Sequence, residues 1–310
     1  MITLSIITAI VLDHFVGETR ICHPLVGFGR LVSAVEKRWR SSANTPQCQF
    51  FVGLIGWLLL TLPPVLLCYG LLQVADGWLS FALQSLILYF CLGYRSLCEH
   101  ARAILAPLLA NDLPEARRQV SKIVSRDTEK LDSAGITRAT VESVLENGND
   151  AVFASLFWFA VAGAPGALLH RLGNTLDARW GYRTGDYLYF GRAAAQLDDI
   201  LNWIPARLCA FSYALVGASS PAISCWRQQA PGAASPNAGP VMAAGAGALK
   251  IKLGGAAIYH GKREERPLLG CGAEVAPADI ERTLALLHRA LVLWVVIIAT
   301  VSWLAGGIPS

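Results

Sequence analysis

The sequence predicts a mainly α-helical, polytopic membrane protein with large helical loops on the cytoplasmic side. Hydrophobic residues make up 54% of the 310 residues, and charged residues make up only 15%. The mean hydropathy of +0.45 is well above that of soluble globular proteins. Several apolar runs are long enough to cross a bilayer, and the charged residues concentrate between them. We therefore expect one integral membrane domain over residues 1–310.

Five apolar stretches are predicted to span the membrane, at residues 1–12, 50–75, 77–94, 208–226 and 290–308. The first is short and lacks a basic start, so we expect a brief or tilted span and not a cleaved signal. Only Asp76 separates the second stretch from the third, which predicts a helical hairpin. Residues 151–169 contain the break GAPG, which favours a re-entrant or kinked element over a straight span.

Four polar loops are predicted to connect these spans, at residues 13–49, 95–150, 171–207 and 227–289. The second loop has helical patterning, with Asn111 or Asp112 and Thr137 as candidate N-caps of helices. In the third loop, Pro205 is expected to end or kink a helix near Trp203. Basic residues are numerous in the first three loops, and such loops usually lie on the cytoplasmic side. The sequence therefore predicts a cytoplasmic active face.

The charge and cysteine content argue against several other classes of protein. A net charge of +4, with basic residues scattered among acidic ones, predicts no nucleic-acid-binding surface. The eight cysteines form no CxxC pair and no zinc-binding spacing, so we expect reduced thiols. The sequence contains no Walker-type loop and no GxGxxG motif, so a nucleotide would have to be held in another way.

The polar segment at residues 173–208 is a candidate for chemistry, because its charged and amide residues lie between two apolar runs. On a helix, Asp198 and Asp199 precede Asn202 by four and three residues, so an amide and at least one carboxylate share a face. Carboxylates beside an amide oxygen suit Mg²⁺, which takes oxygen ligands and is often completed by substrate phosphate. The alternative is that both aspartates are solvated charges paired with arginines of the same segment.

Ionisable residues also follow the first predicted span. Asp13, Glu18 and His23 lie where charges are costly unless they are paired or used. Pro24 favours an extended conformation at His23, which would make this segment stiff. The alternative is an interfacial loop with ordinary polar residues.

Two helical patterns place acids and a cation at useful spacings. Arg126 and Asp127 supply a guanidinium for phosphate and a carboxylate for a metal ion or for orienting the arginine, although Asp127 or Thr128 also suits a helix cap. Glu142 and Glu146 are four residues apart, and like charges at this spacing destabilise a helix unless a cation or arginine lies between them. A paired-acid metal or base site and a solvated helix face both agree with this pattern.

The last polar segment combines a turn with a cationic strip. The sequence SPN at residues 235–237 favours a turn. Lys262, Arg263 and Arg266 follow, and they suit a phosphate group or a membrane surface. The alternative is a solvated run of charges.

Taken in order, these segments resemble the CobD/CbiB family of cobalamin biosynthesis, the membrane-bound adenosylcobinamide-phosphate synthases. The resemblance covers nearly the whole chain. It rests on short motifs in a fixed order and spacing, which are HP at residues 23–24, RSL at 95–97, RDT at 126–128, ENGND at 146–150, NTLD at 174–177, DD at 198–199, PARL at 205–208, SPN at 235–237 and LGG at 253–255.

The resemblance implies an ATP-dependent ligase in the bacterial cytoplasmic (inner) membrane. Such an enzyme joins the propionate carboxylate of adenosylcobyric acid to the amine of aminopropanol phosphate. The implied ligands are the corrinoid, the amino-alcohol phosphate, ATP as a substrate and Mg²⁺ as a cofactor. Association with other cobalamin-assembly enzymes is a further expectation. This chemistry needs cations around phosphate and a base that frees the amine.

The candidate residues are divided according to this chemistry. We assign catalytic roles to Glu146, Asp150 and His23, and metal binding to Asp177, Asp198 and Asp199. We assign binding of substrate or phosphate to Arg126, Asn147, Asn174, Arg179, Arg183, Arg192 and Asn237.

The sequence departs from the family pattern at several positions. It has GET at residues 17–19 where the family usually has GDP, and Ser125 and Ala151 stand where glycine is usual. Met242 stands where a glutamate is usual, which removes a charge. These departures leave open a second hypothesis, an Mg²⁺-dependent membrane transferase acting on a phosphorylated or diphosphate substrate. A transporter or sensor is disfavoured, because the charges lie almost entirely outside the predicted spans.

Overall fold

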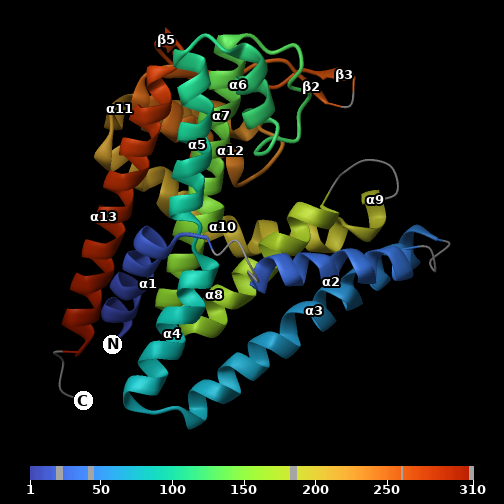
Figure 1. Cartoon of the computed structure of the whole chain (residues 1–310), viewed down its shortest axis with the longest axis vertical. Helices are drawn as coiled ribbons and strands as arrows, with labels where there is room; N and C mark the ends of the chain where they lie inside the picture. Colours follow the sequence, from blue (N-terminus) through green and yellow to red (C-terminus); the bar gives the residue numbers. More distant parts are fainter. Residues whose placement is uncertain (19–23, 41–44, 182–186, 260, 307–310) are drawn as a thin grey trace. The chain divides into compact units, whose positions relative to one another are not determined.

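A computed structural model gives the structure of residues 1–18, 24–40, 45–181, 187–259 and 261–306. It is mainly α-helical (Figure 1). The chain divides into two compact units. Unit 1 comprises Met1–Gly93, Asp150–Asn202 and Val301–Ser310, and unit 2 comprises Tyr94–Asn149 and Trp203–Thr300. The predicted site residues His23 and Arg183 lie outside the described residues.

Within the described residues, four helical segments are long and apolar enough to cross a membrane, and they extend over Pro46–Val74, Gly77–Leu109, Ser133–Trp180 and Ala278–Leu304. Two shorter apolar helices extend over Ile2–Val16 and Ala238–Leu249. A helix satisfies its own backbone hydrogen bonds, which a segment in lipid requires. The chain is therefore a polytopic helical membrane protein.

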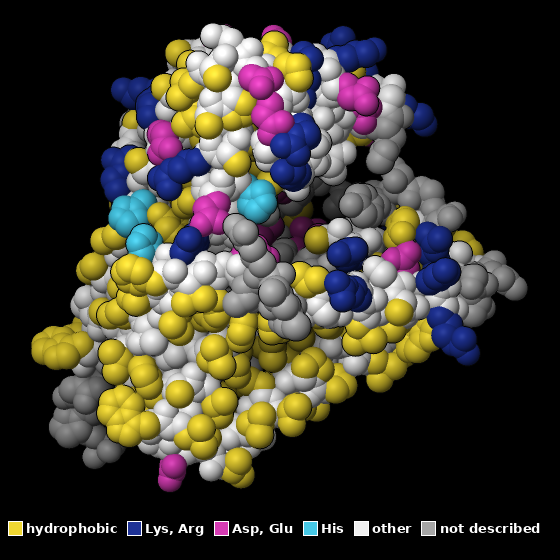
Figure 2. Space-filling view, viewed as in Figure 1, with side chains coloured by type: hydrophobic (Ala, Val, Ile, Leu, Met, Phe, Trp, Pro, Cys, Tyr) yellow, Lys and Arg dark blue, Asp and Glu magenta, His cyan; other side chains and the backbone are white. Residues whose placement is uncertain are grey.

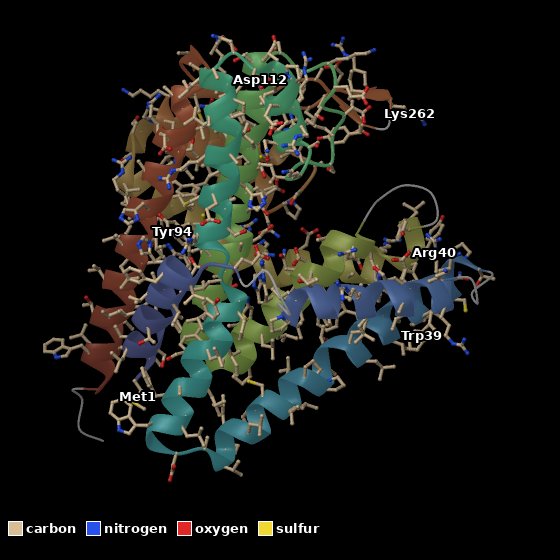
Figure 3. All side chains as sticks on the ribbon, in the orientation of Figure 1. Met1, Trp39, Arg40, Tyr94, Asp112 and Lys262 are labelled. Atoms are coloured by element: carbon tan, nitrogen blue, oxygen red, sulfur yellow. The ribbon has the colours of Figure 1, made fainter. Side chains whose placement is uncertain are left out.

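Unit 1 is built from helices α1 (Ile2–Val16), α2 (Pro24–Trp39), α3 (Pro46–Val74), α4 (Gly77–Cys91), α8 (Ala154–Trp180), α9 (Tyr187–Phe190) and the first part of α10 (Arg192–Val216). Trp39 lies at the end of α2 (Figure 3). Hydrophobic side chains cover the visible face of α3 and α4 (Figure 2). These two helices follow each other with only Ala75 and Asp76 between them.

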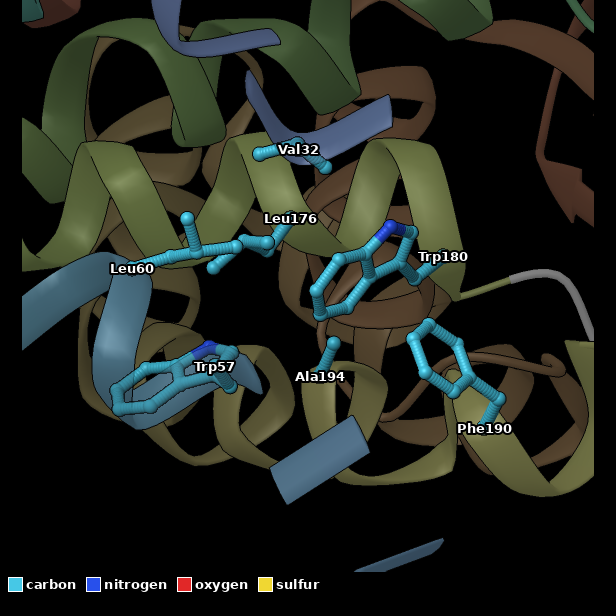
Figure 4. Packing of buried hydrophobic residues seen from close by; sticks show 7 residues of the cluster. All are labelled: Val32, Trp57, Leu60, Leu176, Trp180, Phe190 and Ala194. Atoms are coloured by element: carbon cyan, nitrogen blue, oxygen red, sulfur yellow. The ribbon is translucent and has the colours of Figure 1, made fainter. Parts of the chain in front are cut away.

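The core of unit 1 contains an aromatic pair at its centre. The rings of Trp180 and Phe190 pack edge to face, with 4.8 Å between their centroids. Both are fully buried in a cluster that also contains Val32, Trp57, Leu60, Leu176 and Ala194 (Figure 4). Gly53 lets α3 approach this cluster, because a Cβ atom there would lie 2.0 Å from the carbonyl oxygen of Phe190.

Pro165 and Pro205 each remove a helical hydrogen bond, and the results differ. In α8 the helix is kinked at Gly163, which has a φ of +65° and precedes Pro165; this break lies within the predicted element at residues 151–169. By contrast, α10 continues through Pro205, so of the two predicted outcomes, an end or a kink, the helix end does not occur. Proline has no N–H for the carbonyl of Leu201, which instead accepts a hydrogen bond of 2.9 Å from Trp158 Nε1.

Unit 2 is built from helices α5 (Tyr94–Leu109), α6 (Leu113–Val120), α7 (Ser133–Gly148), α11 (Ser219–Gln229), α12 (Ala238–Leu249), the remainder of α10 and most of α13 (Ala278–Gly306). A π-helical turn, Asn149–Phe153, follows α7, and a 3-10 turn, Ala230–Gly232, follows α11. Lys, Arg, Asp and Glu side chains gather over α5, α6 and the hairpin formed by β2 (Ala257–Tyr259) and β3 (Lys262–Glu264) (Figure 2).

Side-chain caps set the beginnings of two helices in unit 2. Asp112 caps α6, since its Oδ1 accepts a hydrogen bond of 3.1 Å from the Glu115 N–H (Figure 3). Asp132 caps α7 in the same way, with 2.7 Å to the Gly135 N–H. The prediction of Thr137 as this cap is therefore wrong, because Asp132, five residues earlier, accepts from the free amides at the start of the helix.

The predicted span at residues 208–226 does not form one helix. It is divided between α10 and α11 at Gly217 and Ala218. A Cβ atom on Gly217 would lie 2.6 Å from the Cβ of Ala248, so glycine allows α12 to pack against this junction.

Helix α12 is buried along its whole length and consists mainly of alanine and glycine. A Cβ atom on Gly245 would lie 2.5 Å from Leu145 Cδ2, and one on Gly247 would lie 2.7 Å from the carbonyl oxygen of Pro221. The small residues thus allow α7 and α11 to approach the α12 backbone. The structure therefore places a buried, closely packed helix within the predicted polar loop at residues 227–289.

Two small sheets follow α12, and the sequence did not predict them. Strand β1 (Ile251–Gly254) pairs antiparallel with β4 (Leu268–Gly270) and parallel with β5 (Ala273–Glu274), so the order is β4-β1-β5. Strands β2 (Ala257–Tyr259) and β3 (Lys262–Glu264) form an antiparallel hairpin, with Lys262 near its tip (Figure 3).

Candidate functional site

Unit 2 contains a cavity of about 430 Å³, which we call the site cavity. Four segments of the chain line it. They contribute Arg126 from the loop before α7, Glu142, Glu146 and Asn147 from α7, Ser235 from the turn before α12, and Tyr259 and Arg266 from the β region. The volume lies within the usual range for small-molecule sites.

Glu142 holds the wall of the site cavity together. Only 3% of its side chain is exposed, and its Oε2 accepts hydrogen bonds from Arg126 and, at 2.9 Å, from Arg266 Nη2. Its Oε1 accepts a hydrogen bond of 2.7 Å from the Gly254 N–H. Burial of a carboxylate is costly unless it is paired, and these three donors provide that compensation. Two arginines on one carboxylate leave one positive charge in excess within this trio.

The loop that carries Arg126 is tied to the β2–β3 hairpin. The Asp127 N–H donates to the Ile258 carbonyl at 2.8 Å, and Asp127 Oδ2 accepts from the Gly261 N–H at 2.8 Å. Asp127 therefore links this loop to the hairpin instead of capping a helix. This pairing places Arg126 beside Glu142. Arg126 and Arg266 thereby offset the repulsion expected between Glu142 and Glu146 on the same helix face.

Gly254 provides the backbone donor to Glu142 in a conformation that suits glycine. Its φ is +75°, and the next residue, Gly255, has a φ of +80°. A Cβ atom on Gly254 would lie 2.0 Å from the Pro267 carbonyl oxygen, whereas the nearest atom to one on Gly255 would be Leu268 Cδ2, at 3.5 Å.

Alanine at these two glycines is expected to have unequal effects. Gly255→Ala adds only the strain of a positive φ, about 1–2 kcal/mol. Gly254→Ala adds the same strain together with a backbone clash that displaces the donor to Glu142, so we expect it to cost more than about 3 kcal/mol. Thermal unfolding of both variants in detergent measures the difference, and equal losses would contradict this role for Gly254.

Asn147 and Asn237 have well-defined partners in unit 2. Asn147 Nδ2 donates to the Ser143 carbonyl at 2.9 Å and to Ser143 Oγ at 3.1 Å. Asn237 is 6% exposed, and its Oδ1 accepts a hydrogen bond of 3.2 Å from Arg207 Nη1. Asn147 lines the site cavity, whereas Asn237 positions an arginine.

Unit 1 contains the second group of predicted residues, an acidic cluster around Asp198. Asp198 is 8% exposed, and its two oxygens accept hydrogen bonds from Asn202 Nδ2 at 3.1 Å and from Asn174 Nδ2 at 3.4 Å. Burial raises the pKa of Asp198 well above its usual range, and the nearby carboxylates of Asp150 and Asp177 raise it further. Carboxylates that repel one another in this way favour the binding of a cation between them.

The sequence did not single out His170 and Ser155, which extend this cluster. His170 is fully buried; its Nε2 lies 3.2 Å from Asn202 Oδ1 and its Nδ1 lies 3.5 Å from Ser155 Oγ. His170, Asn174 and Asp177 are spaced by four and three residues, so they share one face of α8. That spacing was a readable signal for His170.

The acidic cluster fits Mg²⁺ in the chemistry of its donors. Within the described residues, no three His, Cys, Asp or Glu side chains form a group that could hold a metal ion by themselves. Mg²⁺ commonly takes one or two carboxylates and completes its coordination with water and substrate phosphate. Asp198, together with Asp150 or Asp177, provides such a partial set, and Asp199 is half-buried beside it in sequence.

The remaining predicted arginines of unit 1 lie at the surface. Arg192 is exposed at the start of α10. Arg179 is exposed on α8 and packs against α2, where a Cβ atom on Gly29 would lie 3.2 Å from Arg179 Nη2.

The helices, the site cavity and the acidic cluster define a polytopic membrane protein with the polar groups of a small-molecule site. Comparison with known proteins gives its family. Residues 6–287 match the family described as CobD/Cbib protein. The chain therefore belongs to the CobD/CbiB family, and its role lies in cobalamin biosynthesis.

Curated relatives agree with this assignment over almost the whole chain. The cobalamin biosynthesis protein CobD of Stutzerimonas stutzeri is 51% identical over 302 residues, which cover 97% of this chain and 98% of that protein. The protein of the same name from Chromobacterium violaceum is 50% identical and covers 97% of each chain. That of Rhodobacter capsulatus is 38% identical over 88% of this chain and 87% of its own length. No solved structure shows a significant match.

Proposed function

We propose that this protein is an ATP-dependent ligase that joins adenosylcobyric acid to aminopropanol phosphate and forms adenosylcobinamide phosphate. In the balanced reaction, ATP, the acid and the amine give the amide, ADP and inorganic phosphate. The observation that carries this proposal is the meeting of four separate segments around one cavity of about 430 Å³ in a cobalamin biosynthesis protein.

The site cavity suits the amino-alcohol phosphate. Arg126 and Arg266 line it together with Glu142, Glu146, Glu264 and Glu265, so it offers guanidinium groups to the phosphate and carboxylates to the ammonium group. Glu146 lines the same cavity and is the proposed base that takes a proton from the ammonium group, so that the amine becomes a nucleophile. The corrinoid macrocycle would need a larger surface than this cavity.

The acidic cluster of unit 1 suits the nucleotide. A carboxylate is a poor acyl donor, and transfer of the ATP γ-phosphoryl group would convert it to an acyl phosphate that the amine can attack. Asp198, with Asp150 or Asp177, would hold Mg²⁺, which when bound neutralises phosphate charge. Asn174 and Asn202 would orient the Asp198 carboxylate through the hydrogen bonds described above.

The proposal includes a place in the cell. The basic residues of the polar segments favour the cytoplasmic side of the bacterial inner membrane, where ATP is available. Association with other cobalamin-assembly enzymes would pass the product directly to the next enzyme. In this orientation the turn at residues 75–78 lies on the opposite, outer side of the membrane. Cysteine labelling that finds this turn on the cytoplasmic side would contradict the proposal.

Detergent-purified protein is expected to form the amide when Mg-ATP, adenosylcobyric acid and aminopropanol phosphate are all present. Mass spectrometry should detect a corrinoid heavier by aminopropanol phosphate less one water, with one ADP released per product. Omission of each substrate in turn is the control. Well-folded protein that forms no product, beside an active relative, would contradict the ligase and favour the Mg²⁺-dependent transferase on a diphosphate substrate.

A further inference from the structure

A second cavity in unit 2, of about 480 Å³, has a cationic lining that the proposed ligase does not use. We call it the arginine cavity. Arg207 of α10 and Arg227 of α11 line it together with Trp226 and with prolines of the segment at residues 230–240. No carboxylate lines it among the described residues. Two guanidinium groups without an acid in the same cavity indicate an anionic ligand.

Arg207 is held in place by neutral groups. Its Nη1 donates to the Trp203 carbonyl at 2.7 Å and to Asn237 Oδ1 at 3.2 Å, and its Nη2 donates to the Pro236 carbonyl at 3.3 Å. Its Cζ also lies 4.2 Å from the centre of the Trp203 ring. These contacts fix the guanidinium but leave its charge uncompensated, so the arginine is preorganised for an anion.

An apolar stripe begins at the same arginine. Along α10, five large hydrophobic side chains are between 41% and 53% exposed at spacings of one, four, three and four residues, and these are Trp203, Ile204, Leu208, Phe211 and Leu215. They therefore lie on one face of the helix. In a membrane protein, an exposed apolar stripe suits acyl chains, and tryptophan is common at the level of the lipid headgroups.

We propose that Arg207 and Arg227 bind the phosphate of an anionic phospholipid, whose acyl chains lie along this α10 stripe. The charge of the cavity selects an anion, and the adjoining stripe selects an amphiphile over a soluble phosphate ester. The Trp203 ring connects the arginine cavity with the α10 stripe, since it stacks against Arg207 and is the first residue of the stripe. The inference stands independently of the proposed ligase activity.

The bound lipid would also stabilise one wall of the site cavity. Ala233 and Ala234 line both cavities, so the segment at residues 230–236 separates them. Arg207 already holds this segment through the Pro236 carbonyl. A lipid on Arg207 and Arg227 would immobilise the segment from the opposite side.

Native mass spectrometry of the full-length protein in detergent tests this proposal with phosphatidylglycerol and phosphatidylcholine as probes. Each arginine near an anionic lipid contributes about a fivefold change in binding. We expect Arg227→Gln to weaken binding of phosphatidylglycerol about fivefold, and Arg207→Gln with Arg227→Gln about 25-fold. Binding of phosphatidylcholine should be unchanged.

The matched control is Arg263→Gln with Arg289→Gln, which removes the same charge from two exposed arginines outside the arginine cavity. Equal weakening in the control would mean bulk attraction and would overturn the proposal. Displacement of phosphatidylglycerol by inorganic phosphate or ATP would assign the site to a free phosphate and overturn the lipid. Arg227→Gln keeps the test decisive if Arg207→Gln does not fold, because Arg227 is exposed.

Discussion

Glu142→Gln is expected to lower the unfolding free energy by about 3–5 kcal/mol, because it breaks a buried ion pair and leaves its partners uncompensated. Arg126 and Arg266 have 11% and 19% of their side chains exposed, so water can solvate them only in part. The neutral amide also presents one acceptor oxygen where the carboxylate has two, while three donors remain. The proposed ligase activity should also be lost, because the site cavity would lose its shape.

Thermal unfolding in detergent, followed by circular dichroism, measures this loss. Glu265→Gln is the matched control, since this glutamate lines the same cavity but is exposed and pairs with exposed Arg263. Exposed pairs contribute about 0–1 kcal/mol. Methionine at positions 126, 142 and 266 together should recover much of the stability without activity, because apolar residues can replace a buried ionic group. An unchanged melting temperature of Glu142→Gln would refute the structural role of this residue.

Asp198→Asn is expected to have opposite effects on activity and stability. If Asp198 holds the metal ion or a proton for the reaction, its loss should reduce turnover by about 10²–10⁴-fold. In metal-free buffer the same change should raise the melting temperature, because it removes a buried carboxyl group that lies among other carboxylates. The Asn174 side chain can turn its amide to match the new amide at position 198.

The pH dependence follows from the raised pKa of Asp198. Burial, Asp150 and Asp177 raise this pKa above its value in the unfolded chain, so the folded protein binds this proton more tightly. Stability should therefore rise as pH falls through the raised folded pKa, and it should fall as pH rises through that value. Asp198→Asn should lack this dependence.

Mg²⁺ provides the control for the role of the acidic cluster. It should raise the melting temperature of the natural protein at alkaline pH and raise that of Asp198→Asn much less, because this variant has lost one of the carboxylates that attract the cation. Asp199→Asn tests the neighbouring carboxylate under the same conditions. An Asp198→Asn protein with the natural rate and the natural Mg²⁺ dependence would exclude this residue from the reaction.

The helical membrane fold was predictable because long apolar runs leave few alternatives in a bilayer. Helix ends and short strands that depend on contacts distant in the sequence were harder to predict. Pro205 was expected to end or kink a helix, but α10 continues through it. The Leu201 carbonyl, which lacks a helical donor because of Pro205, accepts a hydrogen bond from the indole of Trp158, 43 residues earlier in the sequence. The short strands after α12 depend on pairing between residues such as Leu253 and Leu269, which leaves little periodicity in strands of four residues or fewer.

The candidate site was predictable in its residues and less so in its contacts. Spacing drew attention to Glu142 and Glu146, yet it could not show that arginines from two other segments meet Glu142. Those contacts join residues 16 and 124 positions apart, and they depend on how the loop and the β region fold back on α7. His170 was missed because a lone histidine in an apolar helix gives a weak signal, although its spacing to Asn174 was visible.

Helix α12 constrains how this protein can evolve. Every position from Ala238 to Leu249 is buried, and several lie too close to a neighbouring backbone or side chain to gain even one carbon atom. Tolerance to substitution along α12 should therefore lack the 3.6-residue rhythm that a helix with one lipid-facing side displays. Sequence drift here should be confined to exchanges among the smallest residues, while the exposed faces of α3 and α4 can change freely among apolar ones.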